Sequence, residues 1–321
     1  MKIYILHPGR AHYPEIDAYT TYFTARGVEV AAGCLDDYTR LAAPGDWILW
    51  CIMGFYPRAL RARVVIHDYR SLSIGRAAPM KDWIKRHLQP APDLRIFQNE
   101  RLRDALAFRD GVPACLLPMG VPDWIFALAH EPVPAGPAGR FCYIGEMSVE
   151  RRFDDVLHAY QDYRRSPDDT LVLVGEPDPR IRARFENVPG IAFTGRLSQR
   201  DALRVVARSD YAVCYFPTHR PHCYQTPTKL LEYAALGKRI LCNGSATHAA
   251  LSQLLGIRCH MAGRAIFDDL PAPLPSIPSN DPVRLRHVAW RTVIDESRVA
   301  EWLRASAACR SRSRSRSRSR R

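Results

Sequence analysis

Residues 140–175 read RFCYIGEMSVERRFDDVLHAYQDYRRSPDDTLVLVG, and this stretch contains the repeating unit of an α/β fold. Two short apolar runs, at 140–144 and 170–174, each end at a glycine. Between them, at 153–163, apolar side chains recur three or four positions apart, as they do in a helix that packs one face. Strands that alternate with helices form parallel sheets, so this stretch predicts a parallel sheet.

The alternation of strand and helix continues on both sides of this stretch. Further apolar runs of strand length lie at residues 2–7, 28–31, 46–52, 63–67, 94–98, 114–117, 191–194, 211–216 and 239–242. Helices are expected at 15–26, ahead of Gly27, and at 295–307. The chain is therefore expected to be an α/β protein with two Rossmann-like domains, each built on a doubly wound parallel sheet.

Several of the expected strands end at a glycine, and this position has a functional meaning. Glycine tolerates the sharp turn by which a strand passes into a loop. In open α/β sheets, ligands bind at the loops that follow the carboxyl ends of the strands. Two such sheets in one chain place the expected ligand site in a cleft between them.

The domain bounds follow from changes in composition. Residues 131–139 (EPVPAGPAG) contain three prolines and two glycines without an apolar period, which predicts a linker. We therefore expect an N-terminal domain at 1–130, a C-terminal domain at 140–280 and a helical segment at 281–309. The tail at 310–321 alternates Arg and Ser and is expected to be disordered.

Charge and hydropathy restrict the location and the partners. The formal net charge is +13, and the seven arginines of the tail account for 7 of it, which leaves 13 − 7 = +6 for the body. A moderately basic body suits a phosphate-bearing substrate or an anionic membrane surface. No run of about 18 apolar residues occurs, and the start lacks a secretory pattern, so a cytoplasmic location is expected.

The nine cysteines occur singly, with no CxxC pair and an odd total. This pattern favours buried reduced thiols over disulfides or structural zinc. No acidic pair of the DxD type stands in a matching context either. We therefore expect no metal site and no required cofactor.

The densest motif is residues 226–238, TPTKLLEYAALGK. Thr226 suits the N-cap of a helix, and Gly237 suits its end. Lys229 and Glu232 lie three positions apart, so they share a face near the start of that helix. The unpaired N–H groups and partial positive charge at a helix start favour a diphosphate, to which Lys229 adds a full charge.

Glu232, one turn further on, can accept hydrogen bonds from the two hydroxyls of a ribose. One short helix is thus able to hold both the phosphates and the ribose of a nucleotide. The alternative is a surface helix that carries an ordinary Lys–Glu pair.

Residues 227–241, PTKLLEYAALGKRIL, resemble the donor-binding segment of GT-B glycosyltransferases of the family 4 type, also known as glycosyl transferases group 1. Residues 143–157 resemble the first strand, loop and helix of that family's second domain, and residues 191–196 resemble its base-contacting segment. The resemblance covers about 140–243 and is weaker over the N-terminal half. It implies a GT-B fold, in which two Rossmann-like domains face each other across a cleft and the N-terminal domain binds the acceptor.

The resemblance also implies a donor site. Glu232 would hold the ribose, Lys229 and Arg151 would face the diphosphate, and the backbone near Gly195 would meet the base. The expected donor-binding residues are Gly145, Arg151, Gly195, Arg196, Tyr224, Thr226, Thr228, Lys229 and Glu232. Two positions depart from the family pattern: Tyr224 stands where a glutamate is frequent, and Glu146 stands where an arginine is frequent.

Catalytic residues are expected in the N-terminal half. The run VVIHDYR ends a strand with His67 and Asp68, and the family often has a histidine near such a strand end. His67 is the favoured candidate, and Asp68 is the alternative as a base if transfer inverts the anomeric centre. Gly9, Arg10 and Asp17 are the candidates on the acceptor side.

A basic stretch is the candidate for membrane contact. Lys81, Lys85 and Arg86, with Trp83 and Ile84 among them, form either a basic amphipathic patch or an ordinary solvated helix face. The patch would place the enzyme at the inner face of the plasma membrane, next to a lipid-linked acceptor.

The predicted function is the transfer of a sugar from a nucleoside-diphosphate sugar to a hydroxyl of a glycan or lipid-linked acceptor, as in polysaccharide or glycolipid synthesis. The sugar, the nucleotide and the stereochemical outcome stay open. One alternative is a GT-B nucleotide-sugar epimerase. Another is a nucleic-acid or partner-binding protein that acts through the Arg/Ser tail, although the body has no RNA-binding motif and no specific nucleic-acid partner is expected.

Overall fold

The computed structural model describes residues 1–321 apart from 10–12, 53, 133, 272 and 307–321. The chain forms two compact units. The N-terminal unit combines Met1–Gly120 with Tyr224–Thr226 and the described residues from Trp290 onward. The C-terminal unit combines Val121–Cys223 with Pro227–Ala289.

The N-terminal unit is built on six parallel strands in the order β2-β1-β3-β4-β5-β6. The strands are β1 (Lys2–Leu6), β2 (Glu29–Gly33), β3 (Ile48–Ile52), β4 (Val64–Tyr69), β5 (Leu94–Phe97) and β6 (Ala114–Leu116). The helices are α1 (Pro14–Thr24), α2 (Leu35–Thr39), α3 (Ala78–His87), α4 (Glu100–Leu106) and α11 (Trp290–Glu296), with a further helical stretch at 299–306. Every residue of the central strand β3 is buried, as expected for a parallel sheet that is covered on both faces.

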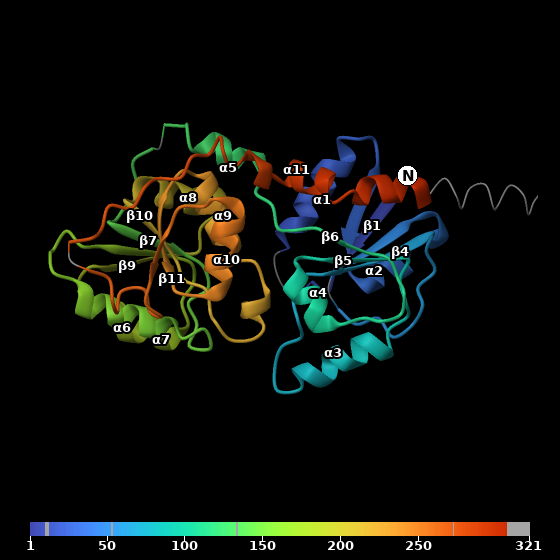
Figure 1. The fold of residues 1–321 in the computed structure, drawn as a ribbon, viewed down its shortest axis with the longest axis horizontal. Coiled ribbons are helices and arrows are strands. Elements are labelled where there is room, and N and C mark those ends of the chain that lie inside the picture. The colour runs from blue at the N-terminus through green and yellow to red at the C-terminus, as the bar shows by residue number, and fades with distance from the viewer. Residues whose placement is uncertain (10–12, 53, 133, 272, 307–321) are drawn as a thin grey trace, which may run out of the picture. The chain divides into compact units, whose positions relative to one another are not determined.

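The C-terminal unit also has six parallel strands, in the order β12-β11-β10-β7-β8-β9. They are β7 (Phe141–Ile144), β8 (Leu171–Val174), β9 (Ile191–Gly195), β10 (Tyr211–Cys214), β11 (Arg239–Asn243) and β12 (His260–Ala262). The helices are α5 (Asp123–Leu128), α6 (Phe153–Tyr163), α7 (Pro179–Phe185), α8 (Gln199–Arg208), α9 (Thr228–Ala235) and α10 (Ala246–Leu255). In Figure 1, α6 and α7 lie on one side of this sheet, and α8 and α9 lie on the other.

The strand order of the C-terminal unit creates a natural binding position. β7, the first strand of the unit, lies between β8 and β10 in the middle of the sheet. The chain winds outward from β7 in one direction through β8 and β9, and in the other through β10, β11 and β12. The β7–β10 pair is therefore the topological switch point, and ligands of open α/β sheets bind at the carboxyl ends of such strands.

The predicted α/β class with two Rossmann-like sheets is thus confirmed. The strand-end glycines also lie where the sequence placed them. Gly145, Gly175 and Gly195 stand at or just after the ends of β7, β8 and β9, and all three have positive φ angles. Among the helices of the described residues, none has the length and apolar character that a membrane crossing requires.

The units do not follow the predicted domain bounds. The backbone N–H of Val121 donates to the carbonyl of Val288 at 2.9 Å, so the change of unit falls at Gly120–Val121 and not in the predicted linker at 131–139. The described residues of that linker pack on α8, where Arg208 donates to the carbonyls of Pro134 and Pro137. The segment has loop composition, yet it is part of the C-terminal unit.

The end of the chain returns to the N-terminal unit. The sequence predicted one helix at 295–307, whereas the structure has α11 and then helical residues 299–306, separated at Arg298, whose φ is +58°. Trp290 packs against Tyr19 of α1 with ring centroids 6.0 Å apart. Residue 307 and the predicted disordered tail lie outside the described residues. Long-range packing, which helical spacing does not encode, decides where this segment belongs.

Candidate functional site

The helix that carries the nucleotide motif is α9, and it begins one residue later than predicted. Pro227 is the N-cap and Thr228 the first helical residue, so the prediction of Thr226 as N-cap was wrong. The backbone N–H of Thr226 instead donates to Oε1 of Gln98 at 3.0 Å. At the other end, Gly237 follows the C-cap with φ +77°, as predicted.

No side chain in the described part of the chain caps the start of α9. The first N–H groups of a helix have no partner within the helix, and they carry the positive end of its dipole. An uncapped start leaves these donors for an anion.

Lys229 and Glu232 lie together at this start, and a third residue joins them. Lys229 Nζ is 2.6 Å from Oε2 of Glu232, and Gln199 Nε2 donates to Oε1 of Glu232 at 2.8 Å. The carboxylate is 7% exposed, so its charge is held in a partly desolvated position with a fixed orientation. Gln199, the first residue of α8, was missed by the sequence analysis because nothing local distinguishes it from a surface glutamine.

The glycines at the ends of β7, β8 and β9 bring backbone segments into close contact. The N–H of Gly145 donates to Val174 at 3.1 Å, and the N–H of Gly175 donates to Gly195 at 3.0 Å. A Cβ added at Gly175 would overlap the carbonyl oxygen of Gly145. At Gly195, by contrast, a Cβ would meet no atom within 4 Å, so of the three glycines only this one faces open space.

Arg151 is not free, because Glu146 pairs with it. Arg151 Nε lies 3.0 Å from Oε2 of Glu146, and the hydroxyl of Tyr215 donates to the carbonyl of Arg151 at 2.7 Å. The guanidinium is mostly covered, whereas the carboxylate of Glu146 is mostly exposed. Glu146, which departs from the family pattern, is thus paired with Arg151, the residue expected to contact the diphosphate.

The predicted donor-binding residues divide between the two units. The C-terminal unit contains Gly145, Arg151, Gly195, Arg196, Thr228, Lys229 and Glu232. Tyr224 and Thr226 belong to the N-terminal unit instead. The carbonyl of Tyr224 accepts a hydrogen bond from Asn99 Nδ2 at 3.0 Å, and its ring packs beside a cluster that includes Phe97 and Leu102. Tyr224 is therefore fixed by its own packing, and its donor role stays a prediction.

Asp68 lies at the centre of a buried network. Its Oδ1 is 2.7 Å from Arg70 Nε, and its Oδ2 accepts from Tyr19 and Trp50 at 3.0 Å each. Asp68 and Arg70 are almost fully buried. Removing one partner of such a pair leaves an uncompensated buried charge. These contacts give Asp68 a structural role, and its role as a base stays a prediction.

His67 points to the opposite face of β4, since successive strand residues alternate. Gln89 Nε2 lies 3.2 Å from its Nδ1, and Arg95 is its partner in register on β5. Burial, with a smaller effect of the charge of Arg95, lowers the pKa of His67 to about 4. The imidazole is therefore neutral at pH 7, able to accept one hydrogen bond and donate another but not to supply a proton as an acid.

Of the predicted acceptor-side residues, Gly9 follows β1 with φ +67°, and Asp17 is exposed on α1. Arg10 lies outside the described residues. Nothing in the described geometry assigns a ligand to Gly9 or Asp17.

Comparisons with known proteins give a fold but no close relative. No protein-family model matches the sequence, and no curated protein matches it either. Solved structures do match. HepE from Anabaena, determined with UDP, is 13% identical, with a TM-score of 0.64 over 95% of this chain and 100% of that chain. An α,α-trehalose-phosphate synthase (UDP-forming) from Burkholderia xenovorans, determined with glucose-6-phosphate, is 12% identical, with a TM-score of 0.62 over 96% and 100%.

A structure from Listeria monocytogenes assigned as a UDP-N-acetylglucosamine 2-epimerase also matches, at 12% identity and a TM-score of 0.51 over 89% of this chain and 94% of that chain. These matches cover nearly the whole of each chain, so the likeness includes both sheets. Together with the two strand orders and the switch point at β7 and β10, they identify the architecture. The chain has the fold of the GT-B glycosyltransferases.

Proposed function

We propose that this protein is a glycosyltransferase that moves a sugar from a nucleoside-diphosphate sugar to a hydroxyl of a glycan or lipid-linked acceptor. The observation that carries the proposal is the Lys229–Glu232–Gln199 network at the uncapped start of α9. This helix follows β10, one of the two strands at the switch point.

The network leaves room for a ribose. An ionised carboxylate offers about four lone-pair sites on its two oxygens. In Glu232, Lys229 uses a site on one oxygen and Gln199 uses a site on the other. Each oxygen keeps a site for a hydroxyl, so the 2′- and 3′-hydroxyls of a ribose can bind without displacing either partner.

The diphosphate would lie against the first N–H groups of α9, with Lys229 beside it. In the reaction, the acceptor oxygen bonds to the anomeric carbon, and the bond from that carbon to the β-phosphate oxygen breaks. The electron pair stays on the leaving diphosphate, and the proton of the acceptor hydroxyl passes to a base. The start of α9, Lys229 and Arg151 stabilise the added negative charge, so no metal is required for this step.

The identity of the base stays a prediction, and the two candidates differ chemically. His67 is neutral and therefore able to accept a proton, although burial makes its protonated form unfavourable. Asp68 has three hydrogen-bonding partners already. His67 stays the favoured candidate and Asp68 the alternative.

The structural neighbours support a choice of first donor. The HepE structure contains UDP, and the trehalose-phosphate synthase is described as UDP-forming. We propose UDP as the first nucleotide to test. Thermal stabilisation of the purified chain by UDP, GDP, dTDP, ADP and CMP would identify the preferred base, and stabilisation by none of the diphosphates would refute the donor site.

Variants of the network test the site itself. Lys229→Ala and Glu232→Ala should each weaken binding of the preferred diphosphate. Arg204→Ala is a matched control, because Arg204 pairs with Asp201 three residues before it on α8 in an exposed ion pair. Unchanged affinity in both site variants would contradict the assignment.

An epimerase is the second candidate, because a structure assigned to that activity shares the fold. An epimerase converts the nucleotide sugar without an acceptor and releases no nucleoside diphosphate as its main product. Product analysis with and without an added acceptor distinguishes the two.

The alternative based on the Arg/Ser tail concerns residues outside the described part. Removal of 310–321 should leave transferase turnover intact.

We also propose that the segment at 74–88 contacts an anionic membrane that carries the acceptor. Four large apolar side chains on and beside α3 are more than half exposed: Ile74, Met80, Trp83 and Leu88. The predicted basic residues contribute less than expected, since Arg86 donates to the carbonyl of Leu106 at 2.6 Å and Lys85 is half-buried. The contact would therefore depend on apolar insertion, with Lys81 nearby for the lipid headgroups.

Cosedimentation with vesicles that contain anionic lipid tests this contact. Trp83→Ser combined with Met80→Ser should reduce binding, whereas Leu254→Ser, which changes a highly exposed leucine of α10, should not. Equal binding of all three proteins would refute the membrane contact without affecting the donor site.

A further inference from the structure

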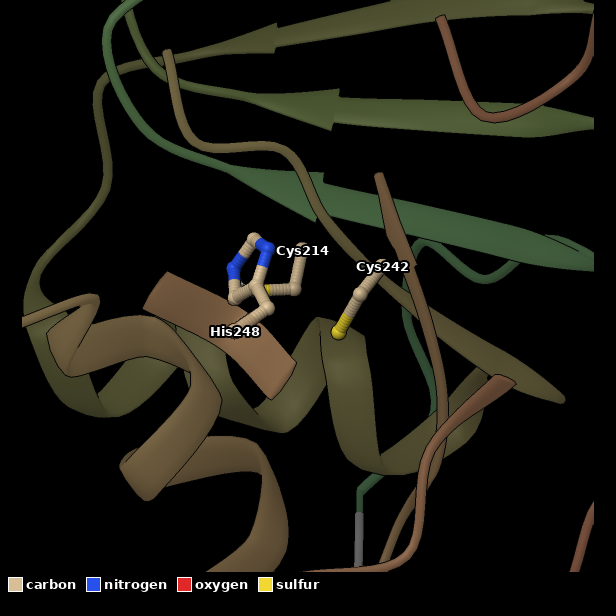
Figure 2. A group of neighbouring side chains, drawn as sticks. All are labelled: Cys214, Cys242 and His248. Atoms are coloured by element: carbon tan, nitrogen blue, oxygen red, sulfur yellow. Dashed lines mark hydrogen bonds between the residues drawn. The ribbon is translucent and has the colours of Figure 1, made fainter. Parts of the chain in front are cut away.

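Three buried side chains outside the donor site meet in the C-terminal unit. Cys214 is the last residue of β10, and Cys242 is its partner in register on β11. His248 comes from the first turn of α10. Their ligand atoms all lie within 4.8 Å of one another, and the three residues are almost completely buried. Figure 2 shows the three side chains together.

The separation of Cys214 and His248 fits a tetrahedral thiophilic metal. With Zn–S bonds of about 2.3 Å and Zn–N bonds of about 2.0–2.1 Å, tetrahedral geometry separates a sulfur from a nitrogen by about 3.6 Å. Two sulfurs are separated by about 3.8 Å on the same basis. Cys214 Sγ lies 3.4 Å from His248 Nε2, so this pair has nearly the required separation.

The histidine is held as metal-binding histidines are held. Its Nδ1 lies 3.0 Å from the carbonyl oxygen of Asn243 and 3.1 Å from Oγ of Ser245. A proton on Nδ1 that is donated to a carbonyl leaves the lone pair on Nε2, which faces Cys214. In metal sites, the non-ligating nitrogen of a histidine commonly donates to a backbone carbonyl in this way.

A third cysteine lies near this group. Cys259, the residue immediately before β12, lies 3.2 Å from Oγ of Ser252 on α10, the helix that carries His248. Two of the eight described cysteines therefore lie with one histidine in a single group, and Cys259 lies outside it. Structural zinc sites have four ligands, so the fourth would come from Cys259 or from a water.

We propose that Cys214, Cys242 and His248 form a structural site for zinc or a similar thiophilic divalent cation, with a fourth position open to Cys259 or a water. The charge balance suits a buried site. Two thiolates and a neutral imidazole neutralise a divalent cation.

The site departs from the sequence-based expectation that all cysteines are isolated buried thiols and that no metal is bound. That expectation rested on the absence of CxxC pairs. These ligands come from two strands and a helix, so parallel register, and not short spacing, brings them together. The metal would tie the ends of β10 and β11 to the start of α10.

Cobalt is a suitable probe, since Co²⁺ in a tetrahedral thiolate site gives charge-transfer and intense visible d–d absorption. The full chain, purified, reduced and freed of metal, would be titrated anaerobically with Co²⁺. We expect these bands to saturate at one equivalent and to disappear on addition of Zn²⁺. Absence of the thiolate bands in the unmodified chain would overturn the proposal, and this result does not depend on any variant.

Variants then locate the site. Cys214→Ala and His248→Ala should lose the cobalt bands, whereas Cys142→Ala should keep them. Cys142 is a matched control because it is buried on β7, in register with Ala212 of β10, but is not part of the cluster. Bands that persist in both cluster variants would refute the assignment. So would a Cys214–Cys242 disulfide, found by mass spectrometry of protein purified without reductant.

Discussion

Replacement of Glu232 by Gln separates the two parts of the proposed donor site. The substitution keeps the shape of the side chain, but it removes the charge and replaces one acceptor oxygen with an NH₂ group. In the structure, Lys229 lies on one carboxylate oxygen and Gln199 on the other. Glu232→Gln therefore removes the acceptor for one ribose hydroxyl and weakens the acceptor for the other.

The expected size follows from these contacts. A hydrogen bond to a charged group contributes about 1.5–3 kcal/mol. The release of Lys229, whose pair with Glu232 is only partly buried, returns at most about 1 kcal/mol through better contact with the diphosphate. The net loss is about 0.5–3 kcal/mol, so we expect the affinity for the preferred nucleoside diphosphate to fall by about two-fold to about 140-fold, since each 1.4 kcal/mol is a factor of about ten.

Titration calorimetry with two ligands is the sharpest assay. The nucleoside diphosphate contains the ribose, whereas inorganic pyrophosphate does not. Glu232→Gln should weaken binding of the nucleoside diphosphate. Binding of pyrophosphate should be unchanged or slightly tighter, because Lys229 is released from its pair with Glu232. Glu301→Gln, in the exposed pair with Arg298, should change neither. An equal loss for both ligands, or no loss for the nucleotide, would refute the ribose assignment.

Three further predictions concern other parts of the chain. Glu146→Ala releases Arg151 from a pair that is exposed on one side, so nucleoside-diphosphate affinity should rise, by at most about five-fold, in the same calorimetric assay; weaker binding would contradict this role. The pKa of His67 is about 4 in the folded protein, against an ordinary value of 6.5. Between these values the unfolded chain binds a proton at His67 and the folded protein does not. The free energy of unfolding is therefore highest above pH 6.5 and falls by about 3 kcal/mol as the pH drops toward 4. Urea denaturation across this range should show the loss, and His67→Gln should flatten it. Gly175→Ala should lower the melting temperature more than Gly195→Ala, because both have positive φ but only the first Cβ meets neighbouring atoms; equal shifts in scanning calorimetry would exclude that overlap.

The elements that sequence alone predicts best are those with a strong local period. The strands β7 and β8 and the helix α6 lie where the apolar runs and the helical spacing placed them. The positions of the glycines at strand ends were predictable for the same reason, since a turn with positive φ restricts the residue type locally.

The errors arose where distant parts of the chain meet. Thr226 is a good N-cap by type, but its backbone is engaged by Gln98, which is distant in sequence. Gln199 completes the Glu232 network from another helix, and no spacing rule connects the two. The cysteines appeared isolated because sequence distance hides the register of parallel strands. In each case the deciding interaction is tertiary.

The return of α11 to the N-terminal unit has a consequence for the order of synthesis and folding. The C-terminal unit is formed mainly from consecutive residues between Val121 and Ala289, so it can fold as soon as these have left the ribosome. The N-terminal unit begins earlier in the chain, yet it lacks the ring of Trp290 beside Tyr19 and the partner of Tyr22, Asp295, until the C-terminal unit has been made. Of the two units, the one that is translated first is therefore completed second.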